Sequence, residues 1–334
     1  MEEPTFADYV ALIYNLFDRF VQECGSEANW ASDRYDYQHK GLIVFFIMMQ
    51  YRRIHKFKTQ WRWLNKHPGL CEQLGFERVP DRTTLSRRYK ALYPIVCAFV
   101  AFLGQYAEEL DECLRSHILY EDKSLFKAAG PVWHQSDRRE GRIPKGLHGL
   151  DTGASWGKSA YHGWVYGYSL HLTCNQAAFP KLVQVETASY SEQQALTDKE
   201  PQIFHALAPD TFVGDDAYTK ALRIRQWTRQ GIALLTPALR WVTGRYARAY
   251  HRFITQPDNA SLLHARKTII EPSFDLLAQV TGCTDNQKQL PVRGRPNVRS
   301  FLAIGVLIVQ IAMIANCIWD LSLRLISHIG VAFT

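Results

Sequence analysis

The chain has 334 residues, of which 47% are hydrophobic and 13% aromatic, and its formal net charge is +7. This length and hydrophobic content exclude a disordered chain, and they allow one large domain or two modest ones with a full core. The basic balance makes a polyanion a plausible partner.

The seven cysteines are scattered, and no CxxC or His/Cys spacing indicates structural zinc. We therefore expect reduced core thiols in a cytoplasmic protein. They are Cys24, Cys71, Cys97, Cys113, Cys174, Cys283 and Cys317. The acidic start MEEPTFADY lacks the apolar run of a signal peptide.

The apolar run 301–319 is nearly long enough to span a bilayer. It contains Gln310 and Asn316, and three arginines precede it at positions 293, 295 and 299. Because the rest of the chain has no other such segment, we predict a buried core helix and no membrane partner. A membrane role for this segment is the alternative.

Residues 6–112 carry apolar positions three or four apart, which is typical of helices. The segment 41–50 is apolar all round, as expected for a buried helix in a bundle. A basic, aromatic-rich helix follows over 51–66, and then a short helix over 70–74 that ends at Gly75.

The segment PDRTTLSRRYK covers residues 80–90, and Asp81 is a good N-cap directly after a proline. The next turns carry four cations, namely Arg82, Arg87, Arg88 and Lys90. A helix, a turn with glycine and a capped basic helix are what a helix-turn-helix needs to enter a DNA major groove. The alternative interpretation is a solvated helix face in a bundle.

Between residues 117 and 238 the period changes to that of strands. We predict strands over 117–120, 164–174, 182–186, 211–214 and 233–236, and helices over 193–207 and 219–230. Early strands followed by alternating helix and strand indicate a mixed α/β sheet.

A second basic cluster with interleaved aromatic residues begins at position 240. It contains Arg240, Arg245, Arg248 and Arg252, together with Trp241, Tyr246 and Tyr250. This mixture suits contact with a nucleic-acid backbone, and a solvated helix face is the alternative.

Two predicted strands run directly into acidic residues. HILYED ends in Asp122, and TFVGDDAY places Asp215 just after Gly214. Carboxylates at neighbouring strand ends can hold Mg²⁺ or Mn²⁺, which prefer oxygen ligands, so we predict both as metal-binding catalytic residues. Asp151 is a rival first acid, but it lies between glycines in an expected loop.

The third candidate acid is Glu271 in ARKTIIEPSFDLL. Pro272 does not fit deep inside a helix without loss of a hydrogen bond, so we expect Glu271 at a helix start or a kink. Arg266 and Lys267, about a turn earlier, are placed to bind phosphate or to balance local charge.

With these residues in place, the sequence resembles bacterial insertion-sequence transposases of the DDE class, the cut-and-paste group. An acid followed two residues later by Ser (Asp122, Ser124), the pattern Asp-x-x-Tyr from Asp215, and Lys267 four positions before Glu271 carry the resemblance. WGKSAYHGWVYGYSLHL is similar to the second and third strands of the family, and PDRTTLSRRY to its DNA-binding region. The chain departs at His264, Lys267 and Ala278, where the family often has Tyr, Arg and Lys.

The resemblance implies an RNase H-like mixed sheet flanked by helices over 115–334 and an all-helical DNA-binding domain over 1–114. It also implies a two-metal site, with Asp122, Asp215 and Glu271 as ligands of two Mg²⁺ or Mn²⁺ ions, that cuts transposon ends and joins their 3′-hydroxyls to target DNA. The expected partners are terminal inverted repeats, target DNA and a second copy of the chain, in the bacterial nucleoid. A domesticated DNA-binding or regulatory protein and a nuclease without strand transfer are the alternatives.

Overall fold

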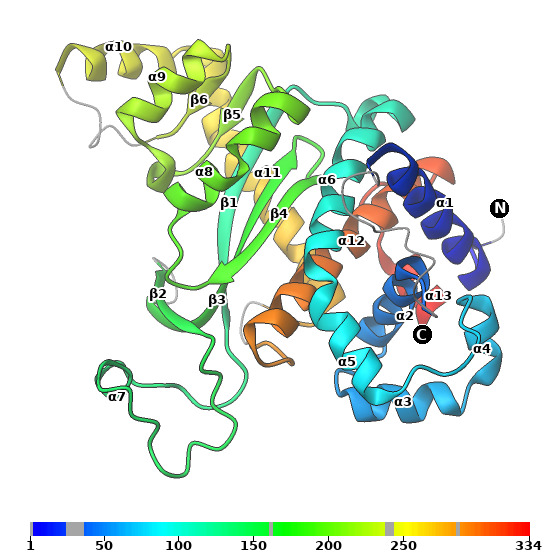
Figure 1. Cartoon of the computed structure of the whole chain (residues 1–334). Helices are drawn as coiled ribbons and strands as arrows, with labels where there is room; N and C mark the ends of the chain where they lie inside the picture. The colour runs from blue at the N-terminus through cyan, green and yellow to red at the C-terminus, as the bar shows by residue number, and fades with distance from the viewer. Residues whose placement is uncertain (1–2, 25–36, 160–162, 238–243, 285–287) are drawn as a thin grey trace.

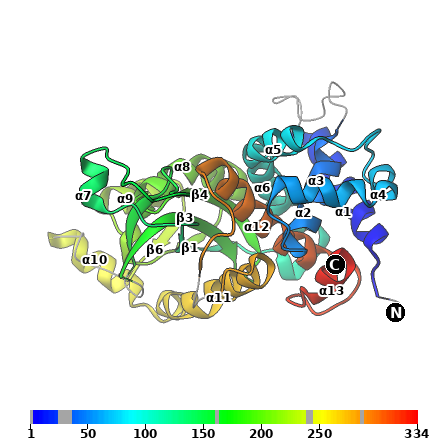
Figure 2. The same ribbon diagram turned by 90° about the horizontal axis from the view of Figure 1, so that it is seen from below.

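Helices begin and end the chain, and a mixed sheet lies between them. The computed structural model describes residues 3–24, 37–159, 163–237, 244–284 and 288–334. The first helices are α1 (Phe6–Cys24), α2 (His39–Tyr51), α3 (Phe57–Asn65), α4 (Pro68–Gln73), α5 (Arg82–Ala91) and α6 (Tyr93–Leu110), followed by the short turn η2 (Glu112–Leu114). In Figures 1 and 2 these helices gather at one end of the molecule with α12 (Arg295–Ile318) and α13 (Ser327–Phe333), and both chain termini lie there.

Helix α12 is the centre of this helical part. By length and composition it is one helix that could cross a membrane, yet 89% of its most apolar window is buried inside the protein. Its Gln310 side chain donates to the carbonyls of Val100 (2.9 Å) and Pro180 (2.8 Å), so the amide nitrogen of this polar group is paired inside the core. The prediction of a buried core helix is confirmed, as is the fully buried segment 41–50 within α2.

The sheet has six strands: β1 (Ile118–Lys127), β2 (Ser155–Ser159), β3 (Gly163–Asn175), β4 (Pro180–Thr187), β5 (Thr211–Val213) and β6 (Ala233–Leu235). The long strand β3 pairs antiparallel with β1 on one side and with β2 and β4 on the other. Strands β5 and β6 add in parallel beyond β1. The predicted mixed α/β sheet is confirmed, while β2 was expected only from the family resemblance.

The sheet lies between helices that precede and follow its parallel strands (Figure 1). These are α8 (Glu192–Gln202) with the π-helical turn η3 (Ile203–Leu207), α9 (Ala221–Arg229), α10 (Gly244–Ile254) and α11 (Pro257–Thr281). Glu121 of β1 bonds to α8 and Asp122 bonds to α11. Because neighbouring strand residues point to opposite faces, α8 and α11 cover opposite faces of β1. A short helix α7 (Gln135–Arg139) lies in the long β1–β2 connection.

The apolar core crosses the expected division at residue 114. One cluster joins α1–α6 and α12 to residues of β3 and β4, and a second fills the space around β1, β5, β6, α9 and α11. The helical part therefore packs directly on the sheet. The division into domains at 114 and the RNase H-like type of the sheet stay predictions.

The cysteine prediction holds in part. Cys71, Cys174 and Cys283 are buried, whereas Cys24 and Cys113 are exposed. Cys24 is the last residue of α1 and Cys113 lies in the short turn η2. The local sequence does not reveal that these two positions lie at the surface.

Candidate active site

The parallel pairing of β1 and β5 sets the position of Asp122. The expectation that Asp122 ends a strand is wrong, because β1 continues to Lys127 in antiparallel pairing with β3, with Asp122 opposite Leu172. Pairing with β5, however, covers only Ile118 to Tyr120. Asp122 thus lies two residues beyond the end of the β1–β5 ladder, where β5 leaves the sheet.

Asp215 lies at the corresponding point of the next strand. β5 ends at Val213, the register partner of Tyr120, so Asp215 also follows the last pair by two residues. Its Oδ1 accepts a hydrogen bond from the Ala217 backbone N–H (2.9 Å), which caps the turn η4 (Asp216–Tyr218). The predicted strand-to-loop position of Asp215 is confirmed, and both acids come to one edge of the sheet.

The two carboxylates lie close enough for the charge of Asp122 to raise the proton affinity of Asp215. Burial raises the pKa of Asp215 to about 6, and the negative charge of Asp122 adds to the effect. Burial also raises the pKa of Asp122, which Arg266 partly offsets. The Arg266 Nη1 to Asp122 Oδ2 distance is 2.8 Å. The edge therefore holds more negative charge than its own cation balances.

A third carboxylate near this pair belongs to Glu192, the first residue of α8, and its charge raises the pKa of both aspartates. Its Oε1 lies 3.4 Å from the Nζ of Lys123, the neighbour of Asp122. The next residue, Gln193, donates from Nε2 to the carbonyl of Ala217, which fixes the start of α8 on the turn that carries Asp215. Sequence reasoning missed Glu192, because an acid after the cap Ser191 is typical of any helix start.

Glu271 does not lie where the sequence placed it. Helix α11 runs without a break from Pro257 to Thr281, so Glu271 is inside a helix rather than at its start or kink. Pro272 removes only one backbone donor, and burial of Ile270 and Leu277 holds the helix together around it. Glu271 is exposed, and its side chain forms no hydrogen bond or ion pair within the described residues.

Arg266 of the same helix is the residue that reaches Asp122. Five positions on an α-helix correspond to a rotation of about 140°, so Arg266 and Glu271 point in well-separated directions. The structure brings together Asp122, Asp215 and Arg266, and within the described residues Glu271 makes no hydrogen bond or ion pair with them.

The donor set fits a hard cation in part. Asp122 and Asp215 are two partly buried carboxylates whose repulsion a divalent cation would relieve. Within the described ranges, however, no three Asp, Glu, His or Cys ligand atoms that include either residue lie within 4.8 Å of one another. The site of three carboxylates and two ions stays a prediction.

Asp151, the rival first acid, has a structural role. It is 2% exposed, and its carboxylate accepts from the Tyr168 hydroxyl (3.0 Å) and from the backbone N–H groups of Gly153 (3.1 Å) and Gly294 (2.8 Å). These donors use both carboxylate oxygens to close the loop before β2. The choice of Asp122 rather than Asp151 as the first acid stays a prediction.

The predicted DNA-binding residues of α5 divide into two groups. Arg82, Arg87 and Lys90 are exposed and, with Lys58, line an open groove of about 830 Å³. Arg88 is a correction, because it is buried and donates to the backbone carbonyl of Tyr37 (3.0 Å). Asp81 caps α5 as predicted, accepting from Thr83 and Thr84 backbone N–H groups.

The remaining predicted DNA-binding residues lie on α10 and α11. Arg245, Arg248 and Lys267 are exposed, whereas Arg266 is partly buried and ion-paired with Asp122. Arg266 therefore balances local charge, the second of the two roles that the sequence allowed. Arg240 and Trp241 lie outside the described residues.

Comparison with known proteins gives little. No family model matches the chain, and a search of curated proteins gives no match. Among solved structures, the chain is similar to one described as "Crystal structure of a pre-cleavage Mos1 transpososome", with a TM-score of 0.20, 11% sequence identity and 78% of each chain covered.

Proposed function

We propose that this chain is a DNA transposase whose phosphodiester chemistry takes place at the sheet edge around Asp122 and Asp215. One observation carries the proposal: two partly buried acids follow the last β1–β5 pair by equal steps, and the charge of Asp122 raises the pKa of Asp215. The sheet, with four antiparallel strands (β1 to β4) and two parallel ones (β5 and β6), is compatible with the RNase H-like fold that the family resemblance implies.

We infer that Asp122 and Asp215 hold Mg²⁺ or Mn²⁺. Bound there, the two ions would supply activation of water, and later of a DNA 3′-hydroxyl, together with stabilisation of the leaving oxygen. The chain's own groups orient the site: Ala217 N–H fixes Asp215, and Arg266 holds Asp122. Glu271 stays the third acid implied by resemblance, while Glu192 is the carboxylate that the geometry favours.

The exposed cations would hold the DNA backbone. Arg82, Arg87 and Lys90 on α5 and Arg245 and Arg248 on α10 offer phosphate contacts, which position a duplex without reading its sequence. Pairing of two DNA ends would require a second protomer, so we propose a homodimer on DNA in the bacterial nucleoid.

The test is Mg²⁺-dependent cleavage of DNA that carries the repeats flanking the gene. We expect Asp215→Asn and Asp122→Asn to lower the cleavage rate by about 10³-fold or more, because each loses a metal-binding charge. Asp210→Asn is the matched control, since Asp210 is an exposed acid at the opposite end of β5. Cleavage by Asp215→Asn at the wild-type rate would show the assignment to be wrong.

A DNA-binding protein that kept the fold but lost the reaction is the second candidate. The exposed position of Glu271 and the ion pair between Arg266 and Asp122 favour it. Such a protein would retard the flanking DNA in a gel without cutting it in Mg²⁺ or Mn²⁺. A nuclease without strand transfer would cut the DNA and leave the 3′ ends unjoined to target.

A further inference from the structure

Two cysteines and an aspartate meet at the junction between the helical part and the sheet. Asp111 and Cys113 belong to the connector from α6 to β1, and Cys317 lies near the end of α12. Their ligand atoms, one carboxylate oxygen and two Sγ atoms, all lie within 4.8 Å of one another. Because Cys113 and Cys317 are far apart in the sequence, no spacing pattern could have predicted this cluster.

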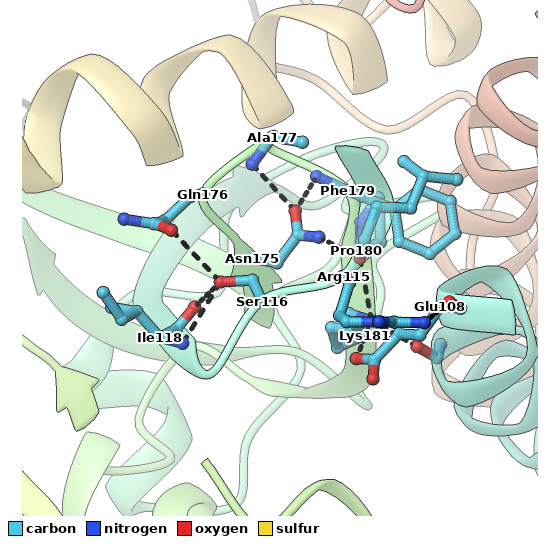
Figure 3. Close-up of polar contacts among 12 residues, drawn as sticks. Glu108, Arg115, Ser116, Ile118, Asn175, Gln176, Ala177, Phe179, Pro180 and Lys181 are labelled. Atoms are coloured by element: carbon cyan, nitrogen blue, oxygen red, sulfur yellow. Dashed lines mark hydrogen bonds and ion pairs between the residues drawn. The ribbon is translucent and has the colours of Figure 1, made fainter. Parts of the chain in front are cut away.

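The connector side of the cluster is held in place. Asp111 Oδ1 accepts from the Cys113 backbone N–H (2.8 Å), and the Leu114 N–H donates to the Asp111 carbonyl (3.1 Å). The Leu114 carbonyl in turn accepts from Asn175 Nδ2 (2.7 Å). Figure 3 shows Asn175 and Lys181 beside the start of the next segment at Arg115 and Ser116. The polar contacts thus fix Cys113 relative to the sheet.

The α12 side is also fixed. Asn316, directly before Cys317, is 1% exposed and donates from Nδ2 to the carbonyls of Ser322, Leu323 and Leu325, each at 3.0 Å. These bonds hold the chain that turns back after α12. A ligand set on two fixed segments needs little ordering when an ion binds.

The chemistry of the donors selects the kind of ion. Thiolates favour Zn²⁺ over Mg²⁺ or Ca²⁺, and a site with three protein ligands keeps one position for water. Cys113 is exposed and Cys317 half-buried, so an ion can enter from solvent. Burial and the negative charge nearby raise the pKa of both thiols, so metal binding must release their protons.

We propose that Asp111, Cys113 and Cys317 bind one Zn²⁺ ion that ties the α6–β1 connector to the end of α12. Both thiols lose a proton to solvent, and the ion takes the two thiolates, a carboxylate oxygen and a water as ligands. This site lies apart from the proposed DNA chemistry and does not rest on it. Its expected effect is on stability of the junction between the helical part and the sheet.

The experiment uses the full reduced chain with Zn²⁺ or Co²⁺ alone. We expect one ion per chain, release of about two protons at neutral pH, and a thiolate-to-cobalt charge-transfer band in the near ultraviolet. Cys113→Ser and Cys317→Ser should each weaken Zn²⁺ binding by more than about 100-fold. Loss of a group that only hydrogen-bonds to a metal ligand costs up to about 100-fold, and loss of the ligand itself should cost more. Zn²⁺ should raise the Tm of the wild type and leave that of both variants unchanged.

Two matched variants serve as controls. Cys24→Ser removes an exposed cysteine elsewhere, and Glu112→Gln removes the exposed carboxylate next to Asp111, so both should bind Co²⁺ as the wild type does. Asp111→Asn keeps an oxygen for the Cys113 N–H but loses the charge, and it should weaken binding. Wild-type Co²⁺ affinity in Cys317→Ser, or a Cys113–Cys317 disulfide that forms in the presence of Zn²⁺, would overturn the proposal.

Discussion

Glu121 and Asp122 are neighbours on β1, yet they lie in opposite electrostatic settings. Glu121 is fully buried and bonds to the Lys199 ammonium and the Thr173 hydroxyl, so its charge is matched on its own face of the sheet. Asp122, on the other face, has Arg266 as its ion-pair partner but also faces Asp215 and Glu192. A closed ion pair holds a helix on a sheet, whereas an acidic cluster with excess charge is poised to take a cation.

The largest expected effect concerns the closed pair. Lys199→Met should lower the free energy of unfolding by about 3–5 kcal/mol, because it leaves the Glu121 carboxylate buried without a counter-charge. Urea denaturation measures this change. The double variant Glu121→Gln/Lys199→Met should recover most of the loss. If Lys199→Met alone were as stable as the wild type, Lys199 would not be the group that balances the Glu121 charge.

In the acidic cluster of Asp122, Asp215 and Glu192, loss of a charge should raise the free energy of unfolding instead of lowering it. The folded pKa of Asp215, about 6, lies above its ordinary value of 3.8, so its stabilising contribution is present when the carboxyl is protonated and is lost as pH rises through about 6. We expect Asp215→Asn to raise the free energy of unfolding at pH 8 by about 2 kcal/mol without metal, while it abolishes cleavage. The gain should shrink as pH falls from about 6 to about 4, because the folded carboxyl is then protonated. A loss of stability at pH 8 would contradict the excess of charge at this edge.

The third acid of the acidic cluster can be identified by a pair of variants. Glu192→Gln should weaken Mn²⁺ binding to the DNA-free chain by about tenfold, since it removes a charge close to both aspartates. Glu271→Gln should change it little, because Glu271 is exposed on another side of α11. Isothermal titration with Mn²⁺ measures both affinities. The reverse ranking would restore the ligand set implied by family resemblance.

The smallest expected effect concerns two neighbouring arginines of α5, of which Arg87 is exposed and Arg88 is buried. Arg87→Gln should weaken binding to DNA of any sequence and reduce the salt slope of log Kobs by about 1, as expected for one phosphate contact. Arg88→Gln should leave the salt slope unchanged and lower stability, because Arg88 bonds to the Tyr37 carbonyl inside the protein. Fluorescence anisotropy over a range of salt concentrations separates the two. A slope that changes equally in both variants would refute the assignment.

Local patterns foretold most elements of the fold. The apolar stretches of α2 and α12, the cap at Asp81, the strand that leads into Asp215 and the alternation after β4 all appear where expected. The errors arose where a local rule met a tertiary contact. β1 continues past Asp122 because β3 pairs with it, and α11 continues past Pro272 because its apolar face is buried.

By itself the sequence determined most of the helices and strands and that Asp215 ends a strand, because periodicity, caps and turn residues act over a few positions. Only the tertiary structure decided which charges meet: Arg266 with Asp122, Arg88 with Tyr37, Glu192 with the two aspartates, and Cys113 with Cys317. Charge pairing depends on which distant strands and helices lie side by side, and a single sequence carries no local signal of that adjacency.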